Sequence, residues 1–200
     1  MPLRAHLDVR QQDDKTSFGR ISPFGPHRRL HGMNKRHALV DSPLGELTLV
    51  ADGSALVGVY FPGHWYRPSV DTFGPRVDDD ALLTEAAAQL NEFLTGARRH
   101  FDIPTEVRGD DLQRRIWNRL SLIPFGETVT YGAIADELAD GTTAQQVGAA
   151  VGRNPLSVVV PCHRVVGKDG KLTGYAGGLE RKKFLLDLEE PADVRAARLF

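Results

Sequence analysis

The stretch Ser157-Val158-Val159-Val160-Pro161-Cys162-His163-Arg164-Val165-Val166 contains the one cysteine in a chain of 200 residues. The β-branched residues on both sides of that cysteine are typical of buried strands, which predicts a strand before it and another after it. Pro161 has no backbone N–H to donate, so a sheet ladder must break or bend there. The sequence therefore predicts that Cys162, His163 and Arg164 lie at an irregular point inside an apolar frame.

A lone cysteine is more often a small buried apolar residue than a nucleophile. The two residues that follow Cys162 favour a chemical role. His163 can accept a proton directly or through a water, and Arg164 adds positive charge, so both would favour the reactive thiolate. Neighbouring side chains on a strand point to opposite faces, so His163 need not touch the sulfur directly.

Four motifs resemble one known family. Pro161-Cys162-His163-Arg164-Val165 resembles the active-site motif of the O6-alkylguanine-DNA alkyltransferases, also called methylated-DNA–protein-cysteine methyltransferases. Gly174-Tyr175-Ala176-Gly177-Gly178-Leu179 is similar to the family's loop that closes over the alkylated base. Phe125-Gly126-Glu127-Thr128-Val129-Thr130-Tyr131-Gly132 and Val147-Gly148-Ala149-Ala150 resemble its DNA-binding helices. The similarity runs from about Asp110 to Glu189, and several motifs in the family's order make it specific.

The resemblance implies a DNA repair protein that transfers the alkyl group from O6-alkylguanine, and by extension O4-alkylthymine, to its own cysteine. Cys162 would be the nucleophile, and His163 the base, acting through a bound water. Glu189 matches the carboxylate that orients the histidine. Tyr131 matches the tyrosine whose hydroxyl donates toward guanine, although an aromatic residue there is more often a packing residue.

Seven more residues match positions that contact DNA or the base. Asn154 matches the asparagine that pins the turn before the active site, where a plain turn asparagine is the alternative. Val165 matches a pocket residue whose carbonyl reads the guanine amine, and Tyr175 and Ala176 match the loop that stacks on the base. The full set is Gln145, Gly148, Arg153, Asn154, Val165, Tyr175 and Ala176.

The expected chemistry needs no cofactor and no metal. The thioether product would have no good leaving group, and the chain has no second cysteine to regenerate the first. The reaction is therefore expected to run once per chain, on a base extruded from the duplex. Two features depart from the family. Gln145 stands where an arginine often fills the gap left by the extruded base, and the cysteines of some members' structural zinc site are missing.

The predicted fold class is α/β (α+β), with three parts. Residues 1–36 are predicted to be a disordered or spurious extension, with Met33 as an alternative start. Residues 37–105 are predicted to form an N-terminal α/β scaffold lobe with no chemical site. Its expected elements are a hairpin of strands 47–51 and 56–61, a helix from Ala81 to about Thr95 capped by the acids at 78–80, and a short strand at 101–104.

Residues 106–200 are predicted to form a mostly helical domain for DNA binding and alkyl transfer. Leu112, Ile116, Trp117 and Leu120 recur on one face of a helix. Thr130 is expected to cap a helix over 131–138, and Thr142 or Thr143 one that reaches about 151 or 152. Two short helices joined by a glycine-containing turn are typical of a helix-turn-helix. The last helix is expected over 180–189.

Small residues line one face of the second of these helices: Ala144, Gly148, Ala149 and Gly152. They would let it approach another surface closely, although tight packing against the core explains them equally well.

The charge of the chain suggests local contact with DNA rather than a global attraction. The net charge is −1. Between residues 143 and 183 the net charge is +5, suited to phosphate contacts or simply to a solvated face. The basic residues there are Arg153, Arg164, Lys168, Lys171, Arg181, Lys182 and Lys183. The expected partner is double-stranded DNA containing O6-alkylguanine, bound by a monomer.

The lone cysteine favours a reducing compartment, and no apolar run is long enough for a membrane span. Together with the lack of an N-terminal secretion signal, these features favour the cytoplasm.

Three other classes of protein remain open on residues alone. A Cys–His hydrolase would turn over repeatedly and would need an oxyanion hole, for which no dedicated motif is present. A non-enzymatic sensor of DNA lesions, like the alkyltransferase-like proteins, would lack the nucleophilic cysteine that stands here at Cys162. A plain helix-turn-helix regulator would have no need of a Cys-His pair at a strand break.

Overall fold

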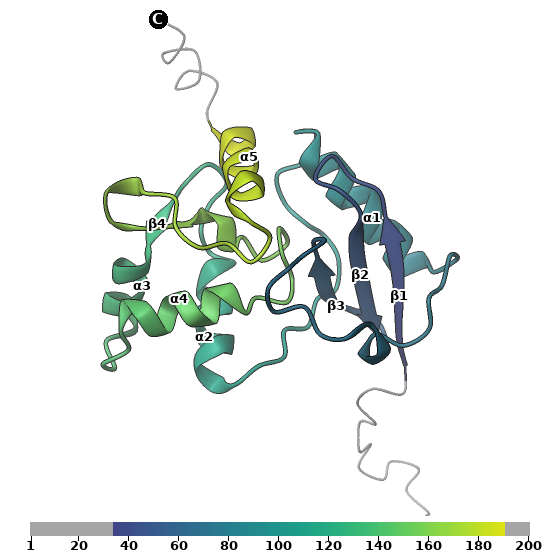
Figure 1. Cartoon of the computed structure of the whole chain (residues 1–200), viewed down its shortest axis with the longest axis horizontal. Helices are drawn as coiled ribbons and strands as arrows, with labels where there is room; N and C mark the ends of the chain where they lie inside the picture. The colour runs from purple at the N-terminus through teal and green to yellow at the C-terminus, as the bar shows by residue number, and fades with distance from the viewer. Residues whose placement is uncertain (1–33, 191–200) are drawn as a thin grey trace, which may run out of the picture. The chain divides into compact units, whose positions relative to one another are not determined.

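Three antiparallel strands form the sheet of the N-terminal half, in the order β1-β2-β3 (Figure 1). They are β1 (Lys35–Val40), β2 (Leu47–Asp52) and β3 (Ala55–Tyr60). The predicted hairpin is confirmed, because β2 and β3 pair across a turn in which Gly53 has φ 59°. This conformation favours glycine, which has no Cβ to clash.

Our predicted boundary between the N-terminal extension and the first lobe was wrong. The computed structural model describes residues 34–190, and predictions for residues 1–33 and 191–200 lie outside these. Residues 35 and 36, which we assigned to the extension, pair with Ala51 and Asp52 as the start of β1. Charged side chains at positions 35 and 36 concealed the strand, because only part of its pattern is apolar.

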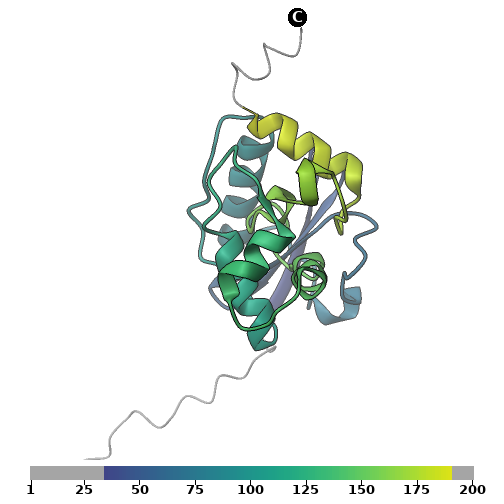
Figure 2. The same ribbon diagram turned by 90° about the vertical axis from the view of Figure 1, so that its left-hand side faces the viewer.

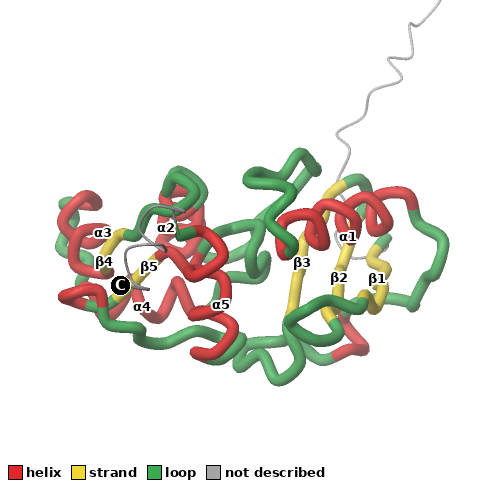
Figure 3. Tube along the Cα trace, turned by 90° about the horizontal axis from the view of Figure 1, so that it is seen from above, coloured by secondary structure: helices red, strands yellow, loops and turns green. Residues whose placement is uncertain are grey.

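The helix α1 (Ala81–Leu94) covers one face of this sheet, as Figure 3 shows from above. Its predicted cap is confirmed, because the side chain of Asp80 accepts a hydrogen bond from the backbone N–H of Leu83 at 3.0 Å. Its apolar stripe is buried against the strands in one core, which includes Leu49, Val59 and Phe93. This lobe also contains the short 3₁₀ helix η1 (Val70–Thr72).

The strand predicted over residues 101–104 is absent. The chain instead makes one isolated bridge between Thr105 and Leu56, in which the N–H of Leu56 donates to Pro104 O at 2.9 Å. Pro104 has no N–H to extend the ladder.

Five elements of the helical half lead up to the active-site turn and include it. They are α2 (Asp111–Leu120), β4 (Val129–Thr130), α3 (Tyr131–Leu138), α4 (Ala144–Gly152) and the 3₁₀ turn η2 (Cys162–Arg164). The caps at Thr130 and Thr143 are confirmed, since each side-chain oxygen accepts from the third residue of its helix. In Figure 2, α4 is seen nearly end-on beside α3.

Beyond the cysteine follow β5 (Val165–Val166), η3 (Lys168–Gly170) and α5 (Leu179–Glu189). β5 pairs in parallel with β4, Val129 opposite Val165. This pairing places the start of α3 next to the chain that leaves the cysteine.

The stretch before Cys162 is a tight turn rather than the predicted strand. Val158 has φ 72°, and the N–H of Val160 donates back to Leu156 O at 2.8 Å. A β-branched residue in the left-handed region is strained, and such strain often occurs at functional sites. The apolar run is buried as expected, but a turn and a 3₁₀ helix are what bury it.

Backbone contacts join the two halves. The N–H of Val59 on β3 donates to Pro155 O at 2.8 Å, and the N–H of Ser157 donates to Val59 O at 3.3 Å. One apolar core runs through both halves, and the Nε1–H of Trp117 ties α2 to Ala150 O of α4 at 2.9 Å. The α/β class is confirmed. No helix in residues 34–190 is long and apolar enough to cross a membrane.

Candidate active site

Cys162 begins the 3₁₀ turn η2 and is 4% exposed. The turn before it is fixed by Asn154, which is itself buried. The Nδ2 group of Asn154 donates to Val160 O at 2.8 Å, and its Oδ1 accepts from the N–H of Leu156 at 3.0 Å. One amide side chain therefore links the end of α4 to both ends of the strained turn.

The carboxylate of Glu189, at the end of α5, joins three groups around the cysteine. His163 Nε2 lies 2.7 Å from Glu189 Oε1. Arg164 donates to the same carboxylate in a bidentate pair, from Nε at 2.8 Å and from Nη2 at 2.9 Å. The backbone N–H of Gly126 donates to Oε2 at 3.1 Å. Glu189, His163 and Arg164 are all buried.

The charge state of Glu189 fixes the tautomer of His163. Burial alone would raise the pKa of Glu189, but the hydrogen bonds from His163 and Arg164 outweigh it and lower that pKa to about 2. An ionised carboxylate can only accept, so Nε2 of His163 must carry the proton that it donates. Burial lowers the pKa of His163 and favours the neutral ring, which leaves Nδ1 with a lone pair.

Nδ1 of His163 is buried and has no hydrogen-bond partner among the described residues. The thiol of Cys162, the preceding residue, is also neutral at rest. Burial raises the pKa of Cys162, and this outweighs the hydrogen bond from Asn154 and the charge of Lys182, which both lower it. The site thus pairs a thiol that must lose a proton with an imidazole nitrogen that can accept one.

Our expectation that Arg164 acts on the sulfur is wrong. Its guanidinium faces Glu189, and its Nη1 donates to Ile123 O at 2.6 Å. Arg164 therefore serves the carboxylate rather than the thiol.

Lys182 is a residue of the site that the sequence analysis missed. It is fully buried in α5, and its Nζ donates to Val165 O at 2.6 Å, to Thr173 O at 2.7 Å and to Gly174 O at 3.3 Å. Burial lowers the pKa of Lys182 to about 8, against an attraction to Cys162 that raises it. It was counted among the phosphate-binding cations because a lysine in a basic run is usually exposed.

Tyr131 opens α3 and faces the loop that precedes α5. Its hydroxyl lies 3.3 Å from Thr173 O, to which it donates, and burial raises its pKa, so it stays protonated. To donate to a bound base, this hydroxyl must exchange the loop carbonyl for that base.

A cavity of about 100 Å³ brings residues of several elements together. Its lining includes four residues singled out from the sequence: Tyr131, Gly148, Tyr175 and Ala176. The ring of Tyr175 is buried, and its hydroxyl has no partner among residues 34–190. Trp65 and Tyr66 also line the cavity, although we assigned no chemical site to the lobe that carries them.

Gln145 lies apart from the cysteine, in the first turn of α4. It lines a second cavity of about 470 Å³, which shares Tyr131 and Gly148 with the first and also includes Lys168. The small residues of α4 are exposed or half-buried, whereas Val147, Ala150 and Val151 carry its contact with the core. Ala144 and Ala149 are thus free for another surface, whereas Gly148 and Gly152 lie against the rings of Tyr131 and Tyr66.

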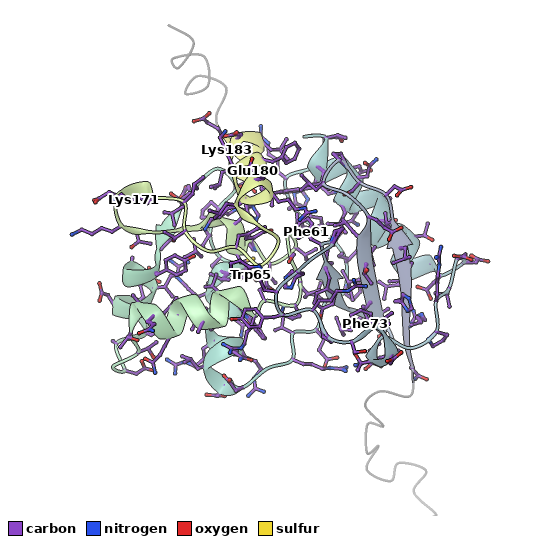
Figure 4. The ribbon with its side chains drawn as sticks, in the orientation of Figure 1. Phe61, Trp65, Phe73, Lys171, Glu180 and Lys183 are labelled. Carbon is purple, nitrogen blue, oxygen red and sulfur yellow. The ribbon has the colours of Figure 1, made fainter. Side chains whose placement is uncertain are left out.

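The basic stretch is smaller than its sequence suggests. Arg164 and Lys182 are buried, and Arg181 donates to the carbonyls of Leu44 and Gly177. The cations that stay exposed are Arg153, Lys168, Lys171 and Lys183, and Figure 4 shows Lys171 on the loop between β5 and α5.

Val165 is buried, and its carbonyl already accepts from Lys182. A second lone pair on that oxygen remains for a ligand. No group of three or more His, Cys, Asp or Glu side chains suited to a metal gathers in the described part of the chain.

Two family models match the chain. The DNA binding domain of 6-O-methylguanine DNA methyltransferase matches residues 111–191, and the ribonuclease-like domain of the same family matches residues 35–107.

Curated relatives carry one description. A methylated-DNA–protein-cysteine methyltransferase of Mycobacterium tuberculosis is 44% identical over 158 residues, which cover 78% of this chain and 94% of the relative. The inducible methylated-DNA–protein-cysteine methyltransferase of Bacillus subtilis is 40% identical over 148 residues, 70% of this chain and 83% of the relative.

A solved structure agrees with these matches. The crystal structure of Mycobacterium tuberculosis OGT in complex with DNA superposes with a TM-score of 0.69 at 41% identity, covering 80% of this chain and 97% of that one. Since both halves match, and several motifs carry the match, this chain belongs to the methylated-DNA–protein-cysteine methyltransferase family, also described as the 6-O-methylguanine DNA methyltransferases.

Proposed function

We propose that this chain repairs DNA by moving the alkyl group of O6-alkylguanine, and of O4-alkylthymine, onto Cys162. The observation that carries the proposal is the buried Cys162 beside a neutral His163 whose other nitrogen is held by Glu189. The relatives described as methylated-DNA–protein-cysteine methyltransferases support it.

The transfer begins with removal of the thiol proton of Cys162. Nδ1 of His163 accepts the proton of the Cys162 thiol through a bound water, and the Glu189 carboxylate stabilises the resulting imidazolium. Positive charge from Lys182 also lies near enough to favour the thiolate. Burial keeps water from competing at the alkyl carbon.

The thiolate then attacks the alkyl carbon. A sulfur–carbon bond forms while the carbon–O6 bond breaks, and its electron pair stays on the guanine. The Tyr131 hydroxyl donates a hydrogen bond to the guanine as this negative charge develops. The proton that left the thiol ends on guanine, so the products are S-alkylcysteine and unmodified guanine. Because no other cysteine is present, the protein is consumed.

Duplex binding is assigned to α3 and α4 acting as a helix-turn-helix. The small outward face of α4 lets its backbone approach DNA closely, and the exposed Arg153, Lys168, Lys171 and Lys183 contact phosphates. The target base is extruded toward the cavity lined by Tyr131 and Tyr175. The related crystal structure in complex with DNA supports DNA binding, and the match of residues 111–191 to a DNA binding domain supports its location in this half.

The remaining features of the proposal concern organisation. We propose that residues 37–105 serve mainly as a scaffold and residues 106–200 as the DNA-binding and transfer domain. The sheet of the scaffold begins at Lys35, two residues before the first of these ranges. A monomer acting in the cytoplasm fits a nucleophile that must stay reduced.

Analysis of the DNA tests the proposal. Duplex DNA containing O6-methylguanine is mixed with increasing amounts of protein, and its nucleosides are quantified. One guanine should appear for each chain added, with no further conversion when DNA is in excess. Repeated conversion by each chain would instead indicate a turnover enzyme such as a hydrolase.

Tyr131→Phe is expected to slow transfer about 30-fold while changing duplex affinity little. The hydroxyl is needed as guanine departs, and a hydrogen bond to a charged group contributes about 2 kcal/mol. The ring, which lines both cavities, remains. Single-turnover rates at saturating protein measure this, and an unchanged rate would remove Tyr131 from the mechanism.

Gln145→Arg is expected to speed repair of duplex DNA more than repair of single-stranded DNA. Arginine brings a flat cation that can stack on bases and hydrogen-bond the orphaned cytosine, whereas glutamine brings no charge. Single-stranded DNA has no orphaned base to bind.

Gln145→Lys is the matched control, because it adds the same charge without the planar group. Equal acceleration by arginine and lysine, or an equal effect on both substrates, would mean that Gln145 simply faces solvent beside the DNA.

A further inference from the structure

The loop from Pro62 to Arg67 follows β3 and carries two exposed aromatic side chains. Trp65 is 70% exposed and Tyr66 is 47% exposed, while Phe61, just before the loop, is fully buried. Figure 4 labels Trp65 near the end of α4 and the loop before α5. Large exposed aromatic rings are uncommon on protein surfaces and often mark a contact site.

The backbone of this loop is fastened to the active-site half at two points. The N–H of Trp65 donates to Ala176 O at 3.2 Å, in the loop proposed to close over the base. His64 Nε2 lies 3.3 Å from Ser157 Oγ, in the strained turn before the cysteine. Trp65 is thus exposed on a fixed backbone.

The His64 ring that contacts Ser157 is neutral. The N–H of Tyr66 donates to its Nδ1 at 3.4 Å, so Nε2 carries the proton and donates to Ser157. Burial, with a smaller effect of the Arg67 charge, lowers the pKa of His64 to about 4. The contact therefore stays intact at neutral pH.

Trp65 and Tyr66 form one wall of the cavity that holds Tyr131 and Tyr175. Tyr66 is held from outside by Arg153, whose guanidinium carbon lies 4.9 Å from the centre of its ring. A Cβ on Gly152 would stand 3.4 Å from Tyr66, so the wall packs directly on the end of α4. Trp65 has no such support within the described residues and presents its ring outward.

We propose that Trp65 contacts the extruded base, so that the first lobe supplies one wall of the base site. This inference rests on the proposed function, because an extruded base must be present. An indole ring at the mouth of a narrow aromatic cavity provides the flat apolar surface on which a base stacks. The scaffold lobe then takes part in substrate binding through this one loop.

A rate comparison is the first test. Trp65→Ala is expected to lower the second-order rate constant for O6-methylguanine in duplex DNA about tenfold, the loss expected for one base–aromatic stack. Trp65→Phe should keep most of the rate. Leu122→Ala is the control, because Leu122 is 73% exposed and lines neither cavity near Tyr131.

Binding to undamaged DNA separates a base contact from a backbone contact. Trp65→Ala should bind an unmodified duplex as the unaltered chain does, since no base is extruded. An unchanged transfer rate would overturn the inference, and so would a loss of undamaged-duplex affinity as large as the loss of rate.

Fluorescence supplies a direct readout in the Cys162→Ala background, where the lesion cannot react. Trp65 emission should fall when duplex containing O6-methylguanine is added, but little when unmodified duplex is added. Trp117, the other tryptophan, is 2% exposed and should give a constant background emission. The Trp65→Phe variant, which keeps only Trp117, measures that background alone. Equal quenching by both duplexes would overturn the inference.

Failure of the Trp65 role can be distinguished from failure of the proposed function. If the unaltered chain transfers no alkyl group, the proposed function fails. If it does transfer the group and Trp65→Ala matches it, only the role of Trp65 fails.

Discussion

Cys162→Ala is expected to leave no detectable alkyl transfer while preserving duplex binding within a few-fold. The sulfur is the atom to which the alkyl group bonds, and no other cysteine can replace it. In the proposed function, binding comes instead from α3, α4 and the exposed cations, which the substitution does not touch. Binding should weaken as salt rises, because phosphate neutralisation releases counterions.

Transfer is measured by nucleoside analysis and binding by titration with fluorescent duplex. Cys162→Ser is the matched control for shape: it keeps a side chain of similar size, but a hydroxyl is a far weaker nucleophile at this pH. Residual transfer by the alanine variant would mean that a residue other than Cys162 accepts the alkyl group. Loss of binding in both variants would contradict the separation between the binding surface and the sulfur.

Glu189→Ala is expected to lower the free energy of unfolding by about 3–5 kcal/mol, because it leaves the buried cation of Arg164 unpaired. It should also slow transfer roughly 100-fold in whatever protein remains folded, since His163 loses the acceptor that fixes its tautomer. Urea unfolding measures the first effect and single-turnover kinetics the second.

Glu180→Ala is the matched control on the same helix, because Glu180 is exposed in the first turn of α5. It should change stability by only a few tenths of a kcal/mol. An equal loss of stability in both variants would mean that the buried cluster around Glu189 contributes no more to the free energy of unfolding than an exposed carboxylate does.

The loss of stability at acid pH provides a second test of the role of Glu189. Its pKa is about 2 in the folded protein against an ordinary 4.5. A depressed carboxyl pKa stabilises the fold above pH 4.5, and that contribution is lost as pH falls toward 2. The difference corresponds to about 3 kcal/mol. Glu189→Gln, which cannot titrate, should flatten the stability curve between these two pH values.

Much of the fold could be predicted because its signals are local. A capping side chain followed by apolar residues at helical spacing marked α1, α3 and α4, and a two-residue turn with Gly53 marked the hairpin. Each of these depends on residues within one or two turns of chain. β1 was missed because its first residues are charged and only part of its pattern is apolar.

The site was harder to predict because its contacts join distant residues. Cys162 and His163 were singled out from their own stretch of sequence and Glu189 through a resemblance, whereas the roles of Arg164 and Lys182 depend on burial that composition does not show. A lysine in a basic run predicts a solvated cation, yet Lys182 donates to three backbone carbonyls. No residue pattern could indicate that Trp65 reaches Ala176, more than 100 positions along the chain.

The turn before Cys162 shows a third kind of limit. Three consecutive valines favour a strand by propensity. Asn154 and the backbone of Val59 instead hold the segment in a turn with Val158 at positive φ. Tertiary hydrogen bonds override local preference there, and the result places the cysteine at the start of a buried 3₁₀ turn rather than in a sheet.

The intact mass of the protein tests the central claim most directly. The chain is mixed with an excess of duplex DNA containing O6-methylguanine, and the protein is then weighed and digested. We predict a gain of one methylene unit on every chain, with the modification in the peptide that contains Cys162 and no further repair afterwards. An unchanged protein mass while the lesion disappears would contradict the claim, as would a methyl group on any other residue.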